Sequence, residues 1–388
     1  MHTDKFLFLF SVFLISVGVI FSLSLSTFTV LLHHGYGEFH FFIRQLFVGI
    51  LSIFVMWGLS RLNPDTYFNP IGFTLFFTSL ILMSIMHFLP ESYVTAAGGA
   101  KRWIRLPGFS LAPVEFFKIG FVYFLSWSFA RKLNENKKSL KEEVKLILPY
   151  VTVFLIAVYL IAILQNDLGQ VVVLALTLAV MAFFAGTSAK LFILTILGAI
   201  SVATIAIKTS AHRILRIKTW WATIQDMVLS LFPKSIADAL RVKDLPEPYQ
   251  ITHSLNAIKH GGLFGTGLGS GTFKLGFLSE VHTDFALAGM TEEIGVVGVG
   301  IVTFVFIAVI FRIFKIANRS DNKVHYLFAL GIGLLITSSF LMNAYGITSI
   351  IPIKGIAVPF LSYGGSSLLA TAVGIGMVLM ISKKADLK

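Results

Sequence analysis

Ionisable side chains occur at the ends of long apolar runs, and these side chains could carry chemistry. Glu115 and Lys118 are three positions apart, so a helix would place them on one face, where they can pair. Asp167 lies in the short polar interruption between two apolar runs, and Asp284 comes just before another. Charges at membrane depth are costly, so each of these residues is a candidate site residue. A carboxylate beside cations suits general-base chemistry on an anionic substrate.

Structural roles are the alternative for each of these residues. Glu115 and Lys118 could form an ion pair that only makes their own burial tolerable. Arg44 and Asp167 could anchor helix ends by reaching toward the membrane surface. The positions of Arg44, Glu115, Lys118, Asp167 and Asp284 near the same ends of their apolar runs favour a shared site.

The stretch 249–295 is the most unusual part of the sequence. It holds six glycines within the eleven residues Gly261–Gly271, and glycine permits close backbone approaches that a Cβ would forbid. A polar segment, Glu280–Asp284, follows, and the next apolar run carries Glu292 and Glu293. Adjacent positions cannot share a helix face, so at least one of these two glutamates should support structure. The glycines fit neither the nucleotide-binding P-loop nor the dinucleotide-binding pattern, so we expect them to shape a lid or groove over the charged residues.

Composition places the chain in the membrane. Of 388 residues, 56% are hydrophobic, and the mean hydropathy is +0.85. The net charge of +12 fits basic residues that face the cytoplasm and anionic lipid, and no nucleic-acid partner is expected. The chain has no cysteine, which excludes disulfides and thiolate metal sites.

Apolar windows of about 20 residues predict an all-α integral membrane protein with about ten transmembrane helices. The predicted spans are 6–30, 41–59, 71–88, 113–129, 147–164, 168–184, 191–207, 286–311, 326–344 and 366–381. The whole chain, 1–388, is expected to form a single polytopic membrane domain. The short interruption between the fifth and sixth spans predicts a tight hairpin.

Basic residues predict that both termini are cytoplasmic. With that orientation, the cytoplasmic segments hold sixteen lysines and arginines, and the short outer loops hold four, including Lys354. One large extracytoplasmic loop, about 209–285, then lies between helices seven and eight. Its part His212–Val242 mixes tryptophans with basic residues, which is typical of an interfacial amphipathic segment or of a plain surface helix. Asp244 and the two prolines after it predict a break.

Several short blocks lie in order over nearly the whole chain, namely Arg44-Gln45, Gly98–Ile104, Pro113–Lys118, Gln165–Gly169, Tyr249-Gln250, Gly261–Gly267, His282–Phe285, Glu292–Gly295 and Pro359–Ser367. Together they resemble the FtsW/RodA group, the SEDS proteins (shape, elongation, division and sporulation) of bacterial cell-wall synthesis. Ser366, Ser367 and Lys354-Gly355 resemble the FtsW branch more than RodA. Three blocks depart from the family pattern at Ala112–Glu115, Gln165–Asp167 and Leu278–Glu280, but each keeps its charged residue.

The resemblance implies a peptidoglycan glycosyltransferase in the bacterial cytoplasmic (inner) membrane. Such an enzyme would polymerise lipid II, the undecaprenyl-pyrophosphate-linked disaccharide-pentapeptide, at the periplasmic face during cell division. The family's essential aspartate corresponds to Asp284. Implied partners are lipid II, a class B penicillin-binding protein transpeptidase and other divisome proteins.

Glycosyl transfer from a pyrophosphate donor needs a base for the attacking hydroxyl and positive charge for the leaving group. Asp284 is the expected general base. The candidate cations for the pyrophosphate are Lys118, Arg44, Arg102, Arg213 and Arg216. Expected supporting residues are Glu115, Asp167, His282, Thr283, Glu280, Gly262, Ser362 and Gly365. A divalent cation, Mg²⁺ or Mn²⁺, could add charge, with Asp284, Glu280 and Asp167 as its candidate ligands.

Two other functions fit part of the pattern. A lipid II flippase could carry such charges at the exit of a translocation path, although transporters place binding groups near the midplane. A non-catalytic scaffold for a partner transpeptidase would need no acid in the outer loop, so Asp284 argues against scaffolding as the only role.

Overall fold

The computed structural model describes residues 3–32, 37–97, 100–106, 109–133, 139–242, 249–352 and 355–386. Gly98, Lys354 and the predicted break at Asp244 lie outside these residues. The described elements are α1 Lys5–Leu25, α2 Thr27–Leu32, α3 His40–Arg61, α4 Pro64–Ile85, β1 Val94–Ala97, β2 Ala100–Leu106, β3 Phe109–Leu111, α5 Pro113–Lys132, α6 Leu140–Val158, the π-helix η1 Tyr159–Leu164, α7 Leu168–Phe184, α8 Ala189–Lys208, α9 Ala211–Leu229, α10 Lys234–Leu240, α11 Tyr249–Gly261, α12 Ala286–Asn318, α13 Lys323–Ile347 and α14 Gly365–Ser382.

The chain is a mostly helical integral membrane protein. Within the described ranges, eight helices are long and apolar enough to cross a membrane, and they are α1, α3, α4, α6 with η1, α8, α12, α13 and α14. Two further helices coincide with predicted spans. Helix α7 is apolar but has 17 residues, and the 20-residue α5 carries Glu115 and Lys118. The number of crossings and the orientation therefore remain predictions.

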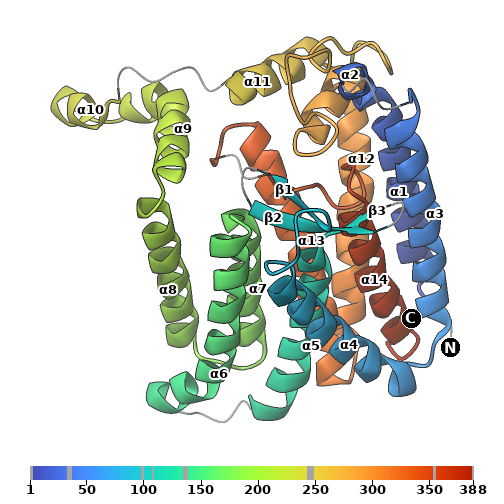
Figure 1. Ribbon diagram of the computed structural model, residues 1–388. Coiled ribbons are helices and arrows are strands. Elements are labelled where there is room, and N and C mark those ends of the chain that lie inside the picture. Colours follow the sequence, from blue (N-terminus) through green and yellow to red (C-terminus); the bar gives the residue numbers. More distant parts are fainter. Residues whose placement is uncertain are drawn as a thin grey trace.

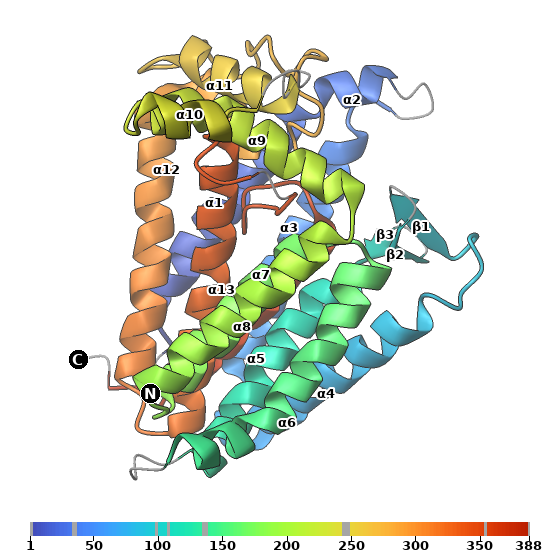
Figure 2. The same cartoon turned by 90° about the vertical axis from the view of Figure 1, so that its left-hand side faces the viewer.

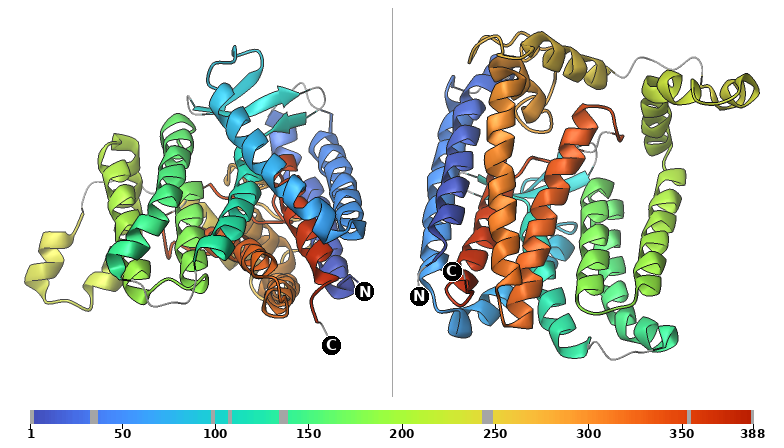
Figure 3. Two further views of the ribbon diagram at one scale, coloured as in Figure 1. Left: turned by 90° about the horizontal axis from the view of Figure 1, so that it is seen from below. Right: turned by 180° about the vertical axis from the view of Figure 1, so that it is seen from behind.

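The long helices form an upright bundle with both chain termini at the same end (Figure 1). Helices α9, α10 and α11 gather at the opposite end (Figure 2). This arrangement agrees with the prediction that the loop 209–285 and the termini lie on opposite sides. Helices α13 and α14 form the centre, with 67% and 72% of their spans buried. Helix α8 stands at the edge beside α7, with 11% of its span buried (Figure 3).

A small sheet differs from the all-helical prediction, whereas the turn of the predicted hairpin agrees with it. Strands β1, β2 and β3 form a small antiparallel sheet in the order β1-β2-β3, in which they pair their own backbone groups outside the spans. The turn of the predicted hairpin is confirmed: η1 is followed by Gln165, by Asn166 with a φ of 51° and by Asp167. Because the sheet carries Arg102 and the turn carries Asp167, both features position candidate site residues.

Candidate active site

Asp284 lies just before α12. Its backbone is held by hydrogen bonds to two carbonyl groups, its own and that of Thr283. The amide of Asn343 on α13 donates to the carbonyl of Asp284 at 2.6 Å and to that of Ile356 at 2.8 Å. The hydroxyl of Ser362 donates to the carbonyl of Thr283 at 2.6 Å. These bonds join the segment before α12 to α13 and to the segment before α14, which fixes where the Asp284 side chain begins.

The half-buried carboxylate of Asp284 lies among groups of both signs. Burial is the largest cause that raises its pKa to about 7, and the negative charges of Glu280 and Asp167 contribute in the same direction. The guanidinium groups of Arg102 and Arg216 act in the opposite direction. A carboxylate with a pKa near 7 exchanges protons readily at neutral pH, as a general base must.

A second acidic group lies at the tip of the hairpin between η1 and α7. Asp167 caps α7 by accepting a hydrogen bond from the backbone N–H of Gln170 at 3.3 Å. Burial raises the pKa of Asp167, while Arg102 and Lys118 act to lower it. The negative charge of Asp167 acts to raise the pKa of Asp284, which agrees with the expectation that the two aspartates lie near one another.

The predicted pair Glu115–Lys118 is also confirmed. The Nζ of Lys118 lies 2.8 Å from Oε2 of Glu115 and donates to Oε1 of Gln170 at 2.9 Å. The amide nitrogen of Gln170 donates to Oε1 of Glu115 at 3.2 Å, which closes a three-residue ring. Lys118 is 8% exposed, so this ring keeps a cation at the edge of the helical core. A small cavity between α5, α7, α13 and α14 begins at this ring and continues along apolar side chains.

Two of the predicted cations hold the hairpin tip. Arg102 of β2 donates from Nε to the carbonyl of Gln165 at 2.7 Å and from Nη2 to that of Asn166 at 3.0 Å. Arg213 of α9 donates from Nη2 to the carbonyl of Ala162 at 2.8 Å and to Oδ1 of Asn166 at 2.9 Å. The positive charge of both arginines therefore stays beside Asp167 while their N–H groups order the turn.

The other two arginines differ in their relation to Asp284. Arg216 is exposed, lies one turn after Arg213 on α9, and acts electrostatically on Asp284. Arg44 lies in the first turns of α3, where its Nη1 is 3.4 Å from Nε2 of His40. The structure thus relates Arg216 to the aspartate through its charge, and it places Arg44 beside His40 on α3.

The polar segment before Asp284 is folded into a tight turn. Glu280 has a φ of 58°, and its carboxylate accepts a hydrogen bond from the hydroxyl of Thr283 at 2.8 Å. His282 is buried against the rings of Phe41 and Tyr363, and burial lowers its pKa. His282 and Thr283 therefore shape the turn that presents Asp284, which agrees with their predicted supporting role.

The two supporting residues near α14 have different functions. Ser362 joins three segments, because its hydroxyl also accepts from the N–H of Val358 at 2.8 Å and its carbonyl accepts from the amide of Gln45 at 3.3 Å. Gly365 begins α14 and faces Val48 of α3, where a Cβ would come within 3.3 Å. Ser362 thus braces the backbone next to Asp284, and Gly365 permits the close packing of α14 and α3.

The glycine-rich loop 261–271 packs on α12, and its contacts there account for several of its glycines. A Cβ at Gly265 would lie 2.2 Å from the carbonyl oxygen of Glu293, so only glycine permits this approach. Gly262 has a φ of 53° and accepts a hydrogen bond from the N–H of Val296. Gly262 therefore belongs to this packing, and the expected lid over the charged residues stays a prediction.

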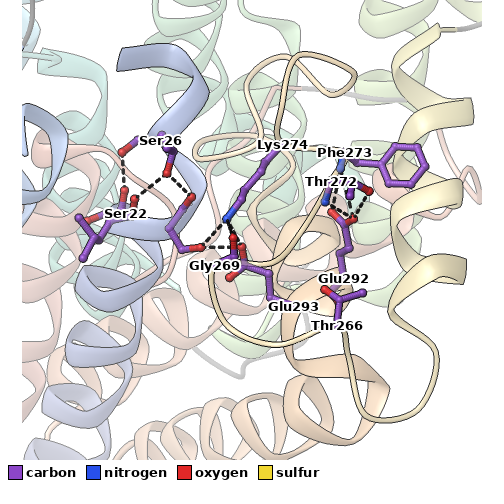
Figure 4. A network of polar contacts seen from close by, with 12 residues as sticks. Ser22, Ser26, Thr266, Gly269, Thr272, Phe273, Lys274, Glu292 and Glu293 are labelled. Atoms are coloured by element: carbon purple, nitrogen blue, oxygen red, sulfur yellow. Dashed lines mark hydrogen bonds and ion pairs between the residues drawn. The ribbon is translucent and has the colours of Figure 1, made fainter. Parts of the chain in front are cut away.

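Glu292 and Glu293 both support structure, as their adjacency predicted for at least one. Glu292 accepts hydrogen bonds from the backbone N–H groups of Thr272 and Phe273 (Figure 4). Glu293 pairs with Lys274 at 2.7 Å and accepts from the hydroxyl of Ser24 on α1 at 2.5 Å. The two carboxylates fasten the loop after α11 to α12 and α1.

Among the described residues, no group of three histidine or acidic side chains has an arrangement that could hold a metal ion. Glu280 is exposed, and its negative charge acts to raise the pKa of Asp284. The chemistry that the side chains themselves offer is a carboxylate base beside arginine cations.

Sequence reasoning missed three residues that complete the site, namely Gln170, Asn343 and Gly355. Gln170 is the third residue of α7, and its N–H is the one that the N-cap Asp167 accepts from. Asn343 is a lone amide in an apolar run, and this was a usable signal. Gly355 was noted only for its resemblance to the FtsW branch, because its approach to Asp284 joins segments about 70 residues apart.

Comparisons with known proteins agree along the whole chain. The FtsW/RodA/SpoVE family, described as cell cycle protein, matches residues 4–387. A Helicobacter pylori protein named probable peptidoglycan glycosyltransferase FtsW is 51% identical over 384 residues, which cover 99% of each chain. The rod shape determining protein RodA of Thermus thermophilus has a similar fold, with a TM-score of 0.65 and 21% identity over 100% of this chain and 98% of that one. A chain of a peptidoglycan synthase complex that coordinates polymerization and crosslinking gives a TM-score of 0.70 and 19% identity over 100% and 99%.

Proposed function

The chain belongs to the FtsW/RodA/SpoVE family, and we infer that it is a peptidoglycan glycosyltransferase of the FtsW type. Relatives that span its full length carry that name, and the fold matches solved structures over the whole chain. We propose that it polymerises lipid II at the outer face of the cytoplasmic membrane during cell division. The apolar spans carry their charged residues at one end, and this supports the proposed location. The polyprenyl chain of lipid II could stay in the bilayer while the attached sugar reaches Asp284.

The observation that carries the mechanism is the half-buried Asp284 with a pKa of about 7 beside Arg216 and Arg102. In the proposed step, Asp284 accepts the proton of the attacking sugar hydroxyl. The hydroxyl oxygen forms a bond to the anomeric carbon of the donor, and the bond from that carbon to the pyrophosphate oxygen breaks. Arg216 stabilises the charge that develops on the departing pyrophosphate.

The remaining cations act around this centre. Lys118 is held by Glu115 and Gln170, so its charge is fixed in place before a substrate arrives. Arg102 and Arg213 keep the hairpin tip rigid and add to the local positive potential. We assign Arg44 to the approach of the substrate, because its exposed guanidinium lies at the start of α3.

We propose that a divalent cation, Mg²⁺ or Mn²⁺, joins the reaction together with the substrate. The electrostatic proximity of Asp284 and Glu280 supports this, since a cation would relieve their mutual repulsion. Substrate phosphates would supply further oxygen ligands, as is usual for Mg²⁺. Glycan synthesis measured in EDTA, and again after Mg²⁺ or Mn²⁺ is returned, tests this point.

The proposed partner is a class B penicillin-binding protein transpeptidase within a larger set of division proteins. Similarity of the fold to a chain of a peptidoglycan synthase complex supports a paired enzyme. A glycosyltransferase held beside a transpeptidase would deliver new strands directly to the crosslinking site.

The decisive experiment supplies lipid II to the purified protein with its partner in detergent. Wild type should form glycan strands, and Asp284→Asn, which keeps the shape of the side chain, should form none. If both proteins form no strands while wild type scrambles lipid II in vesicles, the flippase function replaces the enzyme. If neither activity is present but the partner's transpeptidase still requires the chain, the scaffold function replaces it.

A further inference from the structure

An exposed apolar patch covers the glycine-rich loop and continues onto α12. Leu263 and Phe264 are 64% and 80% exposed, and Leu268 is exposed as well. The eleven residues Gly261–Gly271 include no charged side chain. Large apolar side chains at the tip of a loop are costly in water, so such a patch marks an interaction surface.

Backbone hydrogen bonds tie this loop to a break in α12. Gly295 has the non-helical angles φ 69° and ψ 177°, which free the backbone groups on both sides of it. The N–H groups of Val296 and Val297 donate to the carbonyls of Gly262 and Leu263 at 3.0 Å each. The N–H groups of Thr266 and Gly267 donate back to the carbonyls of Glu292 and Glu293. The loop therefore satisfies the broken helix, as backbone at membrane depth requires.

Buried charges keep the loop from turning its apolar side chains inward. Glu292 holds the N–H groups of Thr272 and Phe273, and Lys274 joins Glu293 to the carbonyl of Gly269 at 2.7 Å (Figure 4). The space behind the loop is thus filled by ion pairs and hydrogen bonds. The side chains of Leu263 and Phe264 therefore point away from this network and are exposed.

The register with α12 gives the depth of the patch. The carbonyl of Leu263 accepts a hydrogen bond from the N–H of Val297, and Lys315 lies eighteen positions after Val297, which is a rise of about 27 Å at 1.5 Å per residue. The hydrocarbon core of a bilayer is about 30 Å thick. When Lys315 lies at the inner boundary, Val297 and the loop lie at the outer one.

The patch is continuous with a surface that must face lipid. Exposed side chains follow one face of α12 from the loop toward the opposite end of the bundle. They are Val296, Val297, Ile301, Phe304, Ile307 and Phe311. In an integral membrane protein such a stripe meets acyl chains, and Leu263 and Phe264 extend it at its outer end.

We propose that the glycine-rich loop is a membrane anchor whose Leu263 and Phe264 side chains insert into the outer-leaflet lipid interface. Its partner is the lipid surface itself, through the apolar boundary between headgroups and acyl chains. The anchor would set the height at which α11 and the segment leading to Asp284 stand above the bilayer. It would not depend on which reaction the chain catalyses.

The absence of cysteine from the chain makes a direct test simple. Phe264→Cys and, separately, Leu263→Cys are made in the full-length protein, spin-labelled and reconstituted in phospholipid vesicles. Collision of each label with oxygen, which partitions into lipid, is compared with collision with a water-soluble nickel chelate. Phe304→Cys on the exposed face of α12 provides the lipid reference, and Asp321→Cys in the exposed turn between α12 and α13 provides the water reference.

Labels at 263 and 264 should match the lipid reference, with oxygen access well above nickel access. Nickel access equal to that at position 321 would place the loop in water and overturn the anchor. Poor access of both reagents would mean that protein, either a second copy or another chain, covers the patch, and this too would overturn it. Both side chains are exposed, so neither substitution should prevent folding.

Discussion

Gly355 lies directly against the carboxylate of Asp284, and a Cβ at position 355 would come within 2.6 Å of Oδ2 of Asp284. The two residues are about 70 positions apart in the sequence. The segment that carries Gly355 is tied to Asp284 through Asn343, which donates to the carbonyls of both Asp284 and Ile356. The position of the proposed base therefore depends on a residue with no side chain.

Gly355→Ala should lower glycan synthesis by about tenfold or more, because a displaced base loses its alignment with the attacking hydroxyl. The melting temperature should hardly change, since the displaced atom is the end of a short side chain. The matched control is Gly58→Ala on α3, where a Cβ would meet nothing within 4 Å. Unchanged synthesis in Gly355→Ala would show that the contact does not position Asp284.

The rate of glycan synthesis should rise with pH through about 7 and then level off, because the base acts only when ionised. At pH 8, where Asp284 is mostly ionised, Asp284→Asn should lower the activity at least about 100-fold, the usual contribution of a general base, and this ratio should shrink below pH 7. The check is a pH–rate profile at saturating and at low lipid II. A profile that stays flat between pH 6 and 8 would contradict the assignment.

The same group should affect stability in the opposite sense. Burial raises the pKa of Asp284 above its unfolded value, so the native state holds the proton more tightly. Stability from this group is present at low pH and falls as pH rises through about 7. Asp284→Asn should therefore melt at a higher temperature than wild type at pH 8, and the difference should shrink at pH 5. A difference that is constant with pH would argue against a raised pKa.

The Glu115–Lys118 pair can be assigned by a double substitution. Glu115→Gln or Lys118→Met alone leaves the other charge buried without its ion-pair partner and should cost about 3–5 kcal/mol of stability. The double variant should recover most of that loss. If Lys118 also serves the pyrophosphate, the double variant will be stable yet poorly active. Full recovery of glycan synthesis would assign the pair to structure alone.

Arg213 and Arg216 lie three residues apart on α9, and their substitution should change different properties of the protein. Arg216→Gln should raise the KM for lipid II and lower kcat, because Arg216 is exposed and acts on the reacting centre. Arg213→Gln should mainly lower the melting temperature, because Arg213 holds the carbonyl of Ala162 and the side chain of Asn166. Equal kinetic effects from both substitutions would contradict this division of roles.

The sequence alone determined the class of the protein and pointed to most residues of the candidate site. Apolar run lengths are set by bilayer thickness, so the spans follow from composition and position. The pairing of Glu115 with Lys118 followed from their spacing, because helix geometry fixes which neighbours can meet. The structural role of Glu292 and Glu293 followed in part from their adjacency.

Tertiary structure decided the relations between distant segments. The approach of Gly355 to Asp284, the amide of Asn343 across two carbonyls and the ring of Gln170 with Lys118 join elements whose separation carries no periodic signal. It also decided that Arg102 and Arg213 use their N–H groups on the hairpin tip, since any exposed arginine looks the same in a sequence. The glycine-rich loop packs on α12 because a broken helix must satisfy its backbone, and that break becomes visible only at Gly295 in three dimensions.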